Sequence, residues 1–229
     1  METRHQSLLK NKYWILRHGK SIPNEMGLIV SSLENGIQEK YQLASDGINQ
    51  ARLAGELLFK ELEEQKIGLE NVRICYSPFA RTTQTAKMVA SVLNIAFESF
   101  QCQVVHNIRE RFFGPSYELK SHDKYPEIWA MDEINPFTQP EGGESVADVA
   151  TRFTRALGMM ESTFENCAVL VVSHGDPLQI LQASINAAKE HREASEADFI
   201  SRIQAIKDPS VLSQHRTFAL NTGELRRLV

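Results

Sequence analysis

Short apolar runs that stop abruptly at polar residues divide the chain into longer segments. Residues 13–16, 72–76 and 168–172 form three such runs, and a weaker apolar segment covers residues 104–108. Bulky and β-branched residues in runs of this length are typical of buried strands. The unbroken run at 168–172 favours a parallel strand covered on both faces, and residues 101–105 fit a short edge strand.

Helical periodicity fills the intervals between these runs. Apolar residues recur at steps of three and four within residues 45–65, 86–93, 144–164 and 178–188. We expect Ser45 to cap the first of these helices, with Asp46 in its first turn. A helical patch at 193–206, a strand at 217–220 and a turn at 221–223 close the chain. Strands that alternate with helices predict an α/β fold.

Two stretches have no clean periodicity. Residues 25–41 predict a loop with short helical pieces. Residues 115–143, here called the excursion, are rich in proline and aromatic residues and too long for a structureless connection. We expect the excursion to be partly helical and to cover the site that the strand ends form. With no repeats and no linker, residues 1–229 are predicted to be a single domain.

Composition excludes several classes of protein. A net charge of −4 argues against binding to nucleic acid or to an acidic membrane surface. The polar N-terminus and the lack of a long apolar run predict neither a secretory signal nor a membrane span, so we expect a cytoplasmic protein. The cysteines Cys75, Cys102 and Cys167 have no metal-type spacing and are expected to be reduced thiols.

Polar side chains follow each of the four apolar segments. Arg17 and His18 follow the first, Arg81 opens the helix after the second, Glu110 follows the third, and His174 follows the fourth. The carboxyl ends of strands in a doubly wound sheet open into one crevice, so these five side chains should line a single pocket. Arginine binds phosphate or carboxylate, and histidine is a nucleophile or base near neutral pH.

The order and spacing of these motifs carry a family resemblance. The motifs are Arg17-His18-Gly19 with Ser21 and Asn24, Ser77-Pro78-x-x-Arg81-x-x-Gln84-Thr85-Ala86, Arg109-Glu110-x-x-x-Gly114, Ser173-His174-Gly175, and the supporting Leu43-x-x-x-Gly47-x-x-Gln50-Ala51. Together they resemble the histidine phosphatase superfamily, in the branch that includes cofactor-dependent phosphoglycerate mutases. The resemblance runs from about residue 13 to 188, with a weak match near 217–225. It implies a phosphoglycerate mutase-like three-layer α/β/α sandwich with a mostly parallel central sheet.

The resemblance also implies a mechanism. His18 would attack a phosphate monoester and become a phosphohistidine, with its other ring nitrogen held by a backbone carbonyl. Glu110 would give a proton to the leaving oxygen and later take one from water. The phosphoryl oxygens would be held by Arg17, Arg81, a protonated His174, Asn24, Ser21 and the Gly175 amide. Protein cations would neutralise the charge, so neither a metal nor a cofactor is expected.

The sequence leaves several alternatives open. The mutases of the family place a His-Tyr pair where Phe112-Phe113 stands here and an Arg-Arg pair later in the excursion, which favours a phosphatase over a mutase. A non-catalytic binding member of the family is the third alternative. Ser21 fits a loop cap as well as a phosphate ligand, and Asp176 fits a helix cap better than a charge that repels phosphate.

Residues around the pocket give less specific expectations. We treat His106, His122 and His215 as ordinary histidines, although His122 lies in the excursion. Aromatic contacts could come from Phe112, Phe113, Tyr117, Tyr125 and Trp129, or these rings could form a small core of the excursion. A second acidic group of a small phosphorylated substrate could meet Lys20, Arg111, Lys120 or Lys124. The identity of the substrate and the oligomeric state stay open.

Overall fold

A five-stranded sheet forms the centre of the described chain. The computed structural model describes residues 9–190 and 198–228. The strands are β1 (Lys12–Arg17), β2 (Val72–Tyr76), β3 (Cys102–Val104), β4 (Ala168–Ser173) and β5 (Leu225–Arg227). Their order is β3-β2-β4-β1-β5, with β5 antiparallel to β1 and the other neighbours parallel. The two strands that carry Arg17 and His174 at their ends, β1 and β4, are therefore direct neighbours.

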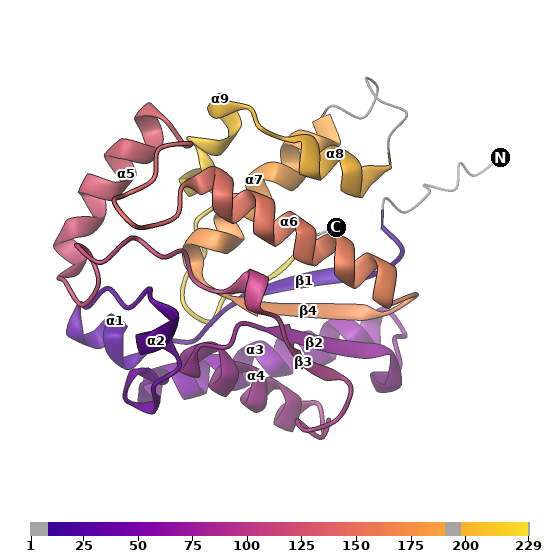
Figure 1. Cartoon of the computed structure of the whole chain (residues 1–229). Coiled ribbons are helices and arrows are strands. Elements are labelled where there is room, and N and C mark those ends of the chain that lie inside the picture. The colour runs from indigo at the N-terminus through magenta and orange to yellow at the C-terminus, as the bar shows by residue number, and fades with distance from the viewer. Residues whose placement is uncertain (1–8, 191–197, 229) are drawn as a thin grey trace.

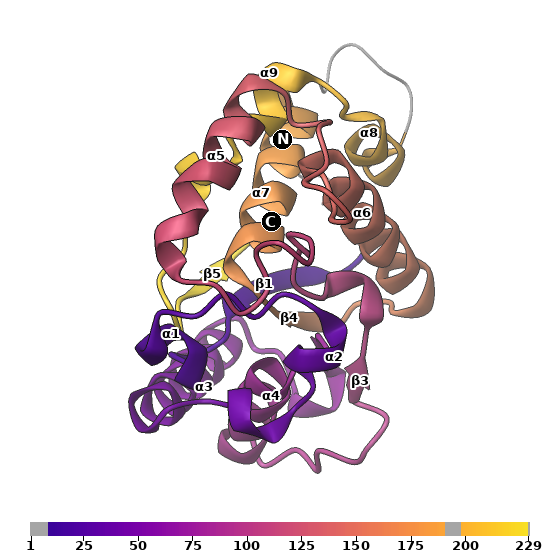
Figure 2. The ribbon, with the colours of Figure 1, turned by 60° about the vertical axis from the view of Figure 1, so that its left-hand side comes forward.

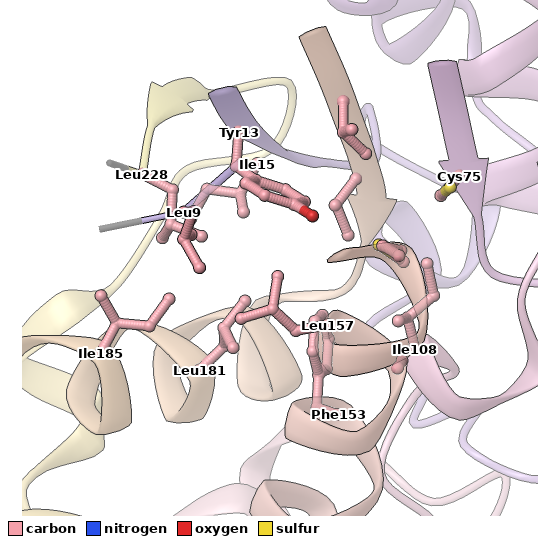
Figure 3. Close-up of a cluster of buried hydrophobic side chains, with 14 of the residues drawn as sticks. Leu9, Tyr13, Ile15, Cys75, Ile108, Phe153, Leu157, Leu181, Ile185 and Leu228 are labelled. Atoms are coloured by element: carbon pink, nitrogen blue, oxygen red, sulfur yellow. The ribbon is translucent and has the colours of Figure 1, made fainter. Parts of the chain in front are cut away.

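Alternation along β1 divides the core into two halves. Tyr13 and Ile15 point into one apolar cluster, and Trp14 and Leu16 point into the other, with all four side chains fully buried. Helices α6 (Val146–Thr163) and α7 (Gly175–Glu190) cover the first face, and α3 (Ser45–Glu64) and α4 (Ala80–Val92) cover the second (Figure 1). Figure 3 shows the first cluster, in which Tyr13 and Ile15 face Leu157 and Leu181. The expected three-layer sandwich with a mostly parallel sheet is confirmed.

The remaining helices are short and surround the carboxyl ends of the strands or follow α7. They are α1 (Ile22–Met26), α2 (Leu33–Gly36), α5 (Tyr125–Ile134), α8 (Phe199–Ala205) and α9 (Pro209–Leu212). Helices α1, α2 and α5 lie at the left-hand end of the molecule in Figure 1 and come forward in Figure 2. Two hydrogen bonds connect the excursion to the loop at residues 25–41. Ile29 N–H donates to Lys120 O (2.8 Å), and Leu119 N–H donates to Ile29 O (2.8 Å).

Three local expectations need correction, and a fourth is tested only in part. Ala44 occupies the N-cap of α3, and Ser45 is already helical and makes no capping bond. Within 104–108, the strand ends at Val104, and residues 106–108 form a 3-10 turn. Residues 217–220 do not form a strand, because His215–Phe218 is a 3-10 turn and the closing strand is β5. The helix expected at 193–206 is α8, and residues 193–197 lie outside the described residues.

Two global expectations can be compared with the structure. All three cysteines are free thiols, with Cys75 and Cys167 buried and Cys102 partly buried. Within residues 9–190 and 198–228, no helix is both long enough and apolar enough to cross a membrane.

Candidate active site

The ends of the parallel strands bring the five predicted side chains into one cluster. His18 N–H donates to Ser173 O (3.0 Å), and Ser77 N–H donates to Val172 O (3.1 Å), so the chain stays in register past the ends of β1, β2 and β4. Arg81, in the first turn of α4, donates from Nε to His18 Nε2 (3.1 Å) and from Nη2 to Glu110 Oε2 (3.3 Å). The rings of His18 and His174 lie edge to face, with centroids 5.2 Å apart.

The contacts of His18 fix its protonation. Its Nδ1 lies 2.7 Å from Gly19 O, an acceptor, so Nδ1 carries the proton and Nε2 keeps its lone pair. Burial, with the charges of Arg81 and Arg17 adding to it, holds the pKa of His18 well below its usual value. The imidazole is therefore neutral at neutral pH, and among the described residues only Arg81 donates a hydrogen bond to its unshared pair. The expected contact between the ring and a backbone carbonyl is present.

Three buried nitrogens of the cluster have no hydrogen-bond partner. They are Arg17 Nε, Arg81 Nη1 and His174 Nδ1, and they make up half of the buried side-chain polar atoms left unpaired in the described chain. Buried polar groups are rarely left without partners, so a concentration of them marks a place where a ligand completes the bonding. Because all three are nitrogens and two belong to guanidinium groups, the missing partner is an acceptor with negative charge.

The cluster faces a small inner recess of about 40 Å³ that opens into an outer cleft of about 440 Å³. Arg17, Asn24, Glu110, His122 and Tyr125 line both spaces. His18 and Arg81 line only the recess. A ligand that fills the recess can therefore extend a second portion into the cleft.

Glu110 titrates near neutral pH. Its side chain is 12% exposed, and its Oε1 accepts the Arg111 N–H (3.0 Å). Burial and the nearby Asp176 charge raise the pKa of Glu110 to about 7, although Arg81 and Arg17 oppose the shift. A carboxyl group with this pKa exists in both forms at neutral pH, as a proton donor and acceptor must.

His174 lies behind the recess in a dry environment. Its Nε2 contacts Ser77 Oγ (2.8 Å), while Nδ1 faces Glu110 Oε2 at 3.6 Å. Burial and the charge of Arg81 hold the pKa of His174 well below its usual value. The ring is therefore neutral in the free protein, and the protonated form expected from the sequence would need the charge of a bound phosphate.

Ser21 caps helix α1, which agrees with its interpretation as a cap rather than a phosphate ligand. Its Oγ accepts the Asn24 N–H (3.3 Å), and the Ser21 N–H donates to Asn24 Oδ1 (3.0 Å), which is a capping box at the start of α1. Both residues also line the recess. Ser21 holds Asn24 Oδ1, so the side-chain amide has a fixed orientation. Asn24 Nδ2 makes no hydrogen bond to a described residue and can donate to a ligand.

Gly175 opens helix α7 beside Arg17. A Cβ on Gly175 would lie 3.3 Å from Arg17 Cζ, so a side chain there would push on the guanidinium. The 16 residues of α7 give its N-terminus a partial positive charge and free amides that suit an anion. Gly19 serves packing instead, because a Cβ there would collide with the carbonyl of Gly47. The Gly47 motif thus positions the backbone that follows His18.

Asp176 belongs to a buried ionic network, which corrects its expected role as a helix cap. Its Oδ2 accepts from Arg111 Nη1 (3.3 Å), and its Oδ1 contacts His215 Nε2 (3.1 Å). Arg111, which is fully buried, also holds both oxygens of Asp132 in α5 at 2.7 Å. Arg111 is therefore unavailable to a substrate, and His215 is not an ordinary histidine.

The network sets the charges of its members. Burial alone would lower the pKa of His215, but its contact with Asp176 outweighs burial and raises the pKa. Burial opposes ionisation of Asp176, yet His215 and Arg111 hold its pKa well below the usual range. The Asp176–His215 pair therefore favours folding at neutral pH. The contribution of the pair to the free energy of unfolding declines as the pH rises through the raised pKa of His215. It also declines at low pH, where Asp176 becomes protonated.

Substitution Asp132→Ala should lower the free energy of unfolding by about 3 kcal/mol, because it leaves the fully buried Arg111 without its bidentate partner. Urea unfolding followed by circular dichroism measures this difference. The double substitution Arg111→Met with Asp132→Leu should recover most of the loss. The control Glu127→Ala, which breaks the exposed pair with Lys124, should leave the midpoint nearly unchanged, and equal losses from the two single changes would contradict the prediction.

The other candidates divide between the cleft and the surface. Phe113, Tyr125 and Trp129 line the cleft, whereas Tyr117 packs beside Ile29 and Ile128 in a small core of the excursion. His122 lines the cleft and contacts Leu28 O through Nε2 (2.9 Å). Six expected residues are absent from the cleft lining, namely Lys20, Arg111, Phe112, Tyr117, Lys120 and Lys124. Of these, Lys20 pairs with Glu25 and Asp46, and Lys124 pairs with Glu127. The sequence missed Gln179 and Arg216, which do line the cleft.

A sheet of this topology, with two histidines, two arginines and a carboxyl group at its strand ends, defines the phosphoglycerate mutase-like class of α/β proteins. The chain belongs to the histidine phosphatase superfamily (branch 1), whose family model matches residues 13–197.

Individual relatives agree with this assignment. The chain is 27% identical over 181 residues to a metal-independent phosphoserine phosphatase of Arabidopsis thaliana, which covers 76% of this chain and 68% of the relative. Among solved structures it is similar to a phosphoserine phosphatase mutant of Entamoeba histolytica bound to phosphoserine, with a TM-score of 0.63, 17% identity and coverage of 94% and 88%. A mycobacterial glucosyl-3-phosphoglycerate phosphatase gives a TM-score of 0.60, 21% identity and coverage of 76% and 78%. These two structures support the fold.

Proposed function

We propose that this protein is a metal-independent phosphatase that hydrolyses phosphate monoesters through a phosphohistidine on His18. The observation that carries the proposal is a neutral histidine whose Nε2 lone pair accepts a hydrogen bond from Arg81 Nε, surrounded by buried nitrogens that lack acceptors. A phosphoryl group supplies both an electrophilic phosphorus and the missing negatively charged oxygens. The curated relative named for phosphoserine hydrolysis is consistent with this reaction.

In the first step, His18 Nε2 attacks phosphorus in line with the ester oxygen. The lone pair becomes the N–P bond, and the P–O bond breaks with its electrons going to the leaving oxygen. The protonated Glu110 gives its proton to that oxygen, so an alcohol leaves. Because Arg81 Nε donates to Nε2 in the free protein, this bond must move to the phosphoryl group as the substrate binds.

Charge neutralisation comes from the chain itself. The phosphoryl oxygens would accept hydrogen bonds from Arg17 Nε, Arg81 Nη1 and His174 Nδ1. Asn24 Nδ2 and the backbone amide of Gly175 would be further donors. Their positions are set before the substrate arrives, which is how fixed dipoles lower a barrier without reorganisation.

In the second step, the Glu110 carboxylate takes a proton from water as the water attacks the phosphohistidine. The P–N bond breaks, the electrons return to Nε2, and inorganic phosphate leaves. Glu110 is then protonated again and ready for another cycle.

The walls of the cleft favour hydrolysis over mutase chemistry. A mutase holds a bisphosphate and so needs a second set of phosphate donors. Phe113 lines the cleft and offers no hydrogen-bond donor to a second phosphate. The nearby Arg111 already donates to Asp132 and Asp176. A wall of this kind offers little to a second phosphate dianion.

Rapid quenching in alkaline detergent after incubation with a ³²P-labelled phosphate monoester tests the proposal. In excess chelator, the parent protein should release inorganic phosphate and carry label on an acid-labile, base-stable bond, which peptide mapping should locate at His18. Turnover without label on His18, or turnover that chelator abolishes, would contradict the proposal. Label that passes to an acceptor instead of water would indicate a mutase, and bound substrate without label would indicate a non-catalytic binding protein.

A further inference from the structure

Arg216 lies over an aromatic stack in the wall of the outer cleft. Its guanidinium carbon is 3.5 Å from the ring centroid of Trp129. Trp129 also stacks on Tyr125, with centroids 5.5 Å apart and planes 6° from parallel. Arg216 belongs to the 3-10 turn His215–Phe218, and Tyr125 and Trp129 belong to α5. A guanidinium held against an indole face keeps its edge, with the N–H groups, available in a fixed direction.

The charge of Arg216 has no counterion within the described chain. Arg81, Arg109, Arg111 and Arg152 each form an ion pair with a carboxylate. In contrast, the Arg216 side chain makes neither an ion pair nor a hydrogen bond to any residue in 9–190 or 198–228, although it is only partly exposed. A positive charge fixed in a cleft without a counterion is suited to an anion of the ligand.

The position of Arg216 separates it from the phosphate site. It lines the outer cleft and is absent from the inner recess, whereas His18 and Arg81 line the recess alone. Arg17 and Glu110 line both spaces and so mark where the two meet. A phosphoryl group at His18 would therefore place the rest of a substrate in the cleft, toward Arg216.

We propose that Arg216 binds a carboxylate carried by the organic part of the substrate, so that the preferred substrates are small phosphate monoesters of hydroxy acids or hydroxy amino acids. This assignment rests on the proposed phosphatase function. The planar fork of a guanidinium matches the two oxygens of a carboxylate. Glu110 and Asp176 share the cleft and make it a poorer place for a second phosphate dianion than for a monoanion.

Two monoesters that differ by one group test the proposal. O-phosphoserine and O-phosphoethanolamine share the phosphate and the ammonium group, and only the former has a carboxylate. We expect kcat/KM for O-phosphoserine to be roughly 10- to 100-fold higher in the parent protein, which is the range for one charge-assisted pair. Arg216→Met should reduce this ratio to near one, mainly through KM of O-phosphoserine, and Arg216→Lys should restore only part of it because the fork is lost.

The control is Arg155→Met, which removes an exposed arginine of α6 that does not line the cleft and should leave the ratio unchanged. A ratio near one in the parent protein, or a ratio that Arg216→Met does not change, would overturn the role of Arg216 while phosphatase activity persists. A larger effect of Arg216→Met on propane-1,3-diol bisphosphate than on O-phosphoserine would assign the subsite to phosphate and overturn the carboxylate. Failure of the proposed function looks different, because no monoester would then label His18.

Discussion

Substitution His18→Asn should reduce phosphomonoester turnover by about 10⁴-fold or more and abolish the labelled intermediate. Asparagine can keep a hydrogen bond to Gly19 O, which His18 Nδ1 makes at 2.7 Å, but it has no nucleophilic lone pair at the position of Nε2. Removing a nucleophile removes the covalent route altogether and leaves only the binding contribution of the surrounding groups. Release of phosphate and trapping of label in the same preparation measure both effects.

The matched control for this substitution is His122→Asn. His122 lines the same recess and cleft, yet its ring contacts Leu28 O and lies in the excursion. We expect its replacement to retain the phosphohistidine. Equal turnover in the parent protein and His18→Asn would mean that another group attacks phosphorus, and the assignment of the whole cluster would then be wrong.

Substitution Glu110→Gln should slow the hydrolysis of alkyl phosphates by about 10²- to 10⁴-fold, the usual contribution of a positioned acid and base. With 4-nitrophenyl phosphate, the leaving phenolate needs little protonation, so the first step should persist. The second step still lacks its base. The variant should therefore release a burst of about one nitrophenolate per protein and then turn over slowly, with phosphohistidine accumulating. Stopped-flow absorbance and quenching in alkaline detergent detect these two signatures.

The pH profile gives an independent reading of Glu110. The acid form is needed in the first step, and the pKa of Glu110 in the free protein is about 7. After correction for the substrate, whose own pKa is near 6, kcat/KM should fall as pH rises through about 7. His18 titrates well below its usual value, so its protonation should not lower the rate until the pH is well below 6.5. A profile that stays flat through pH 7, or a Glu110→Gln variant without a burst, would contradict this role.

Strand ends proved easier to predict than the segments that close the site. The apolar runs of β1, β2 and β4 are local signals, and a parallel sheet converts their ends into neighbours. The strand β5 has the sequence Leu-Arg-Arg and lies at an edge, so its pairing with Trp14 and Leu16 leaves no apolar pattern to detect. Residues 217–220, Thr-Phe-Ala-Leu, instead predict a strand from a short apolar run where the structure has the end of a 3-10 turn.

Ion pairs between residues that are far apart in sequence were equally difficult to predict. Arg111 reads as a basic residue beside a pocket, and only the fold shows that Asp132 and Asp176 occupy its donors. Asp176 reads as a cap because it opens a helix, while its true partner His215 lies 39 residues away. The stack of Arg216 on Trp129 is another contact of this kind. A single sequence carries no signal for such pairs, because either partner alone resembles a solvated surface residue.

Segments from opposite ends of the sequence meet at the nucleophile. Gly223 N–H lies 3.1 Å from both Arg17 O and His18 O, and Arg17 Nη1 donates to Leu220 O (2.6 Å). During synthesis, His18 therefore leaves the ribosome some 200 residues before the turn that holds its backbone, and contacts of such long range form slowly. A nascent chain released before residue 220 would carry every phosphate-binding group and still lack a rigid site. The proposed phosphoryl transfer therefore depends on the docking of a turn that is synthesised about 200 residues after His18.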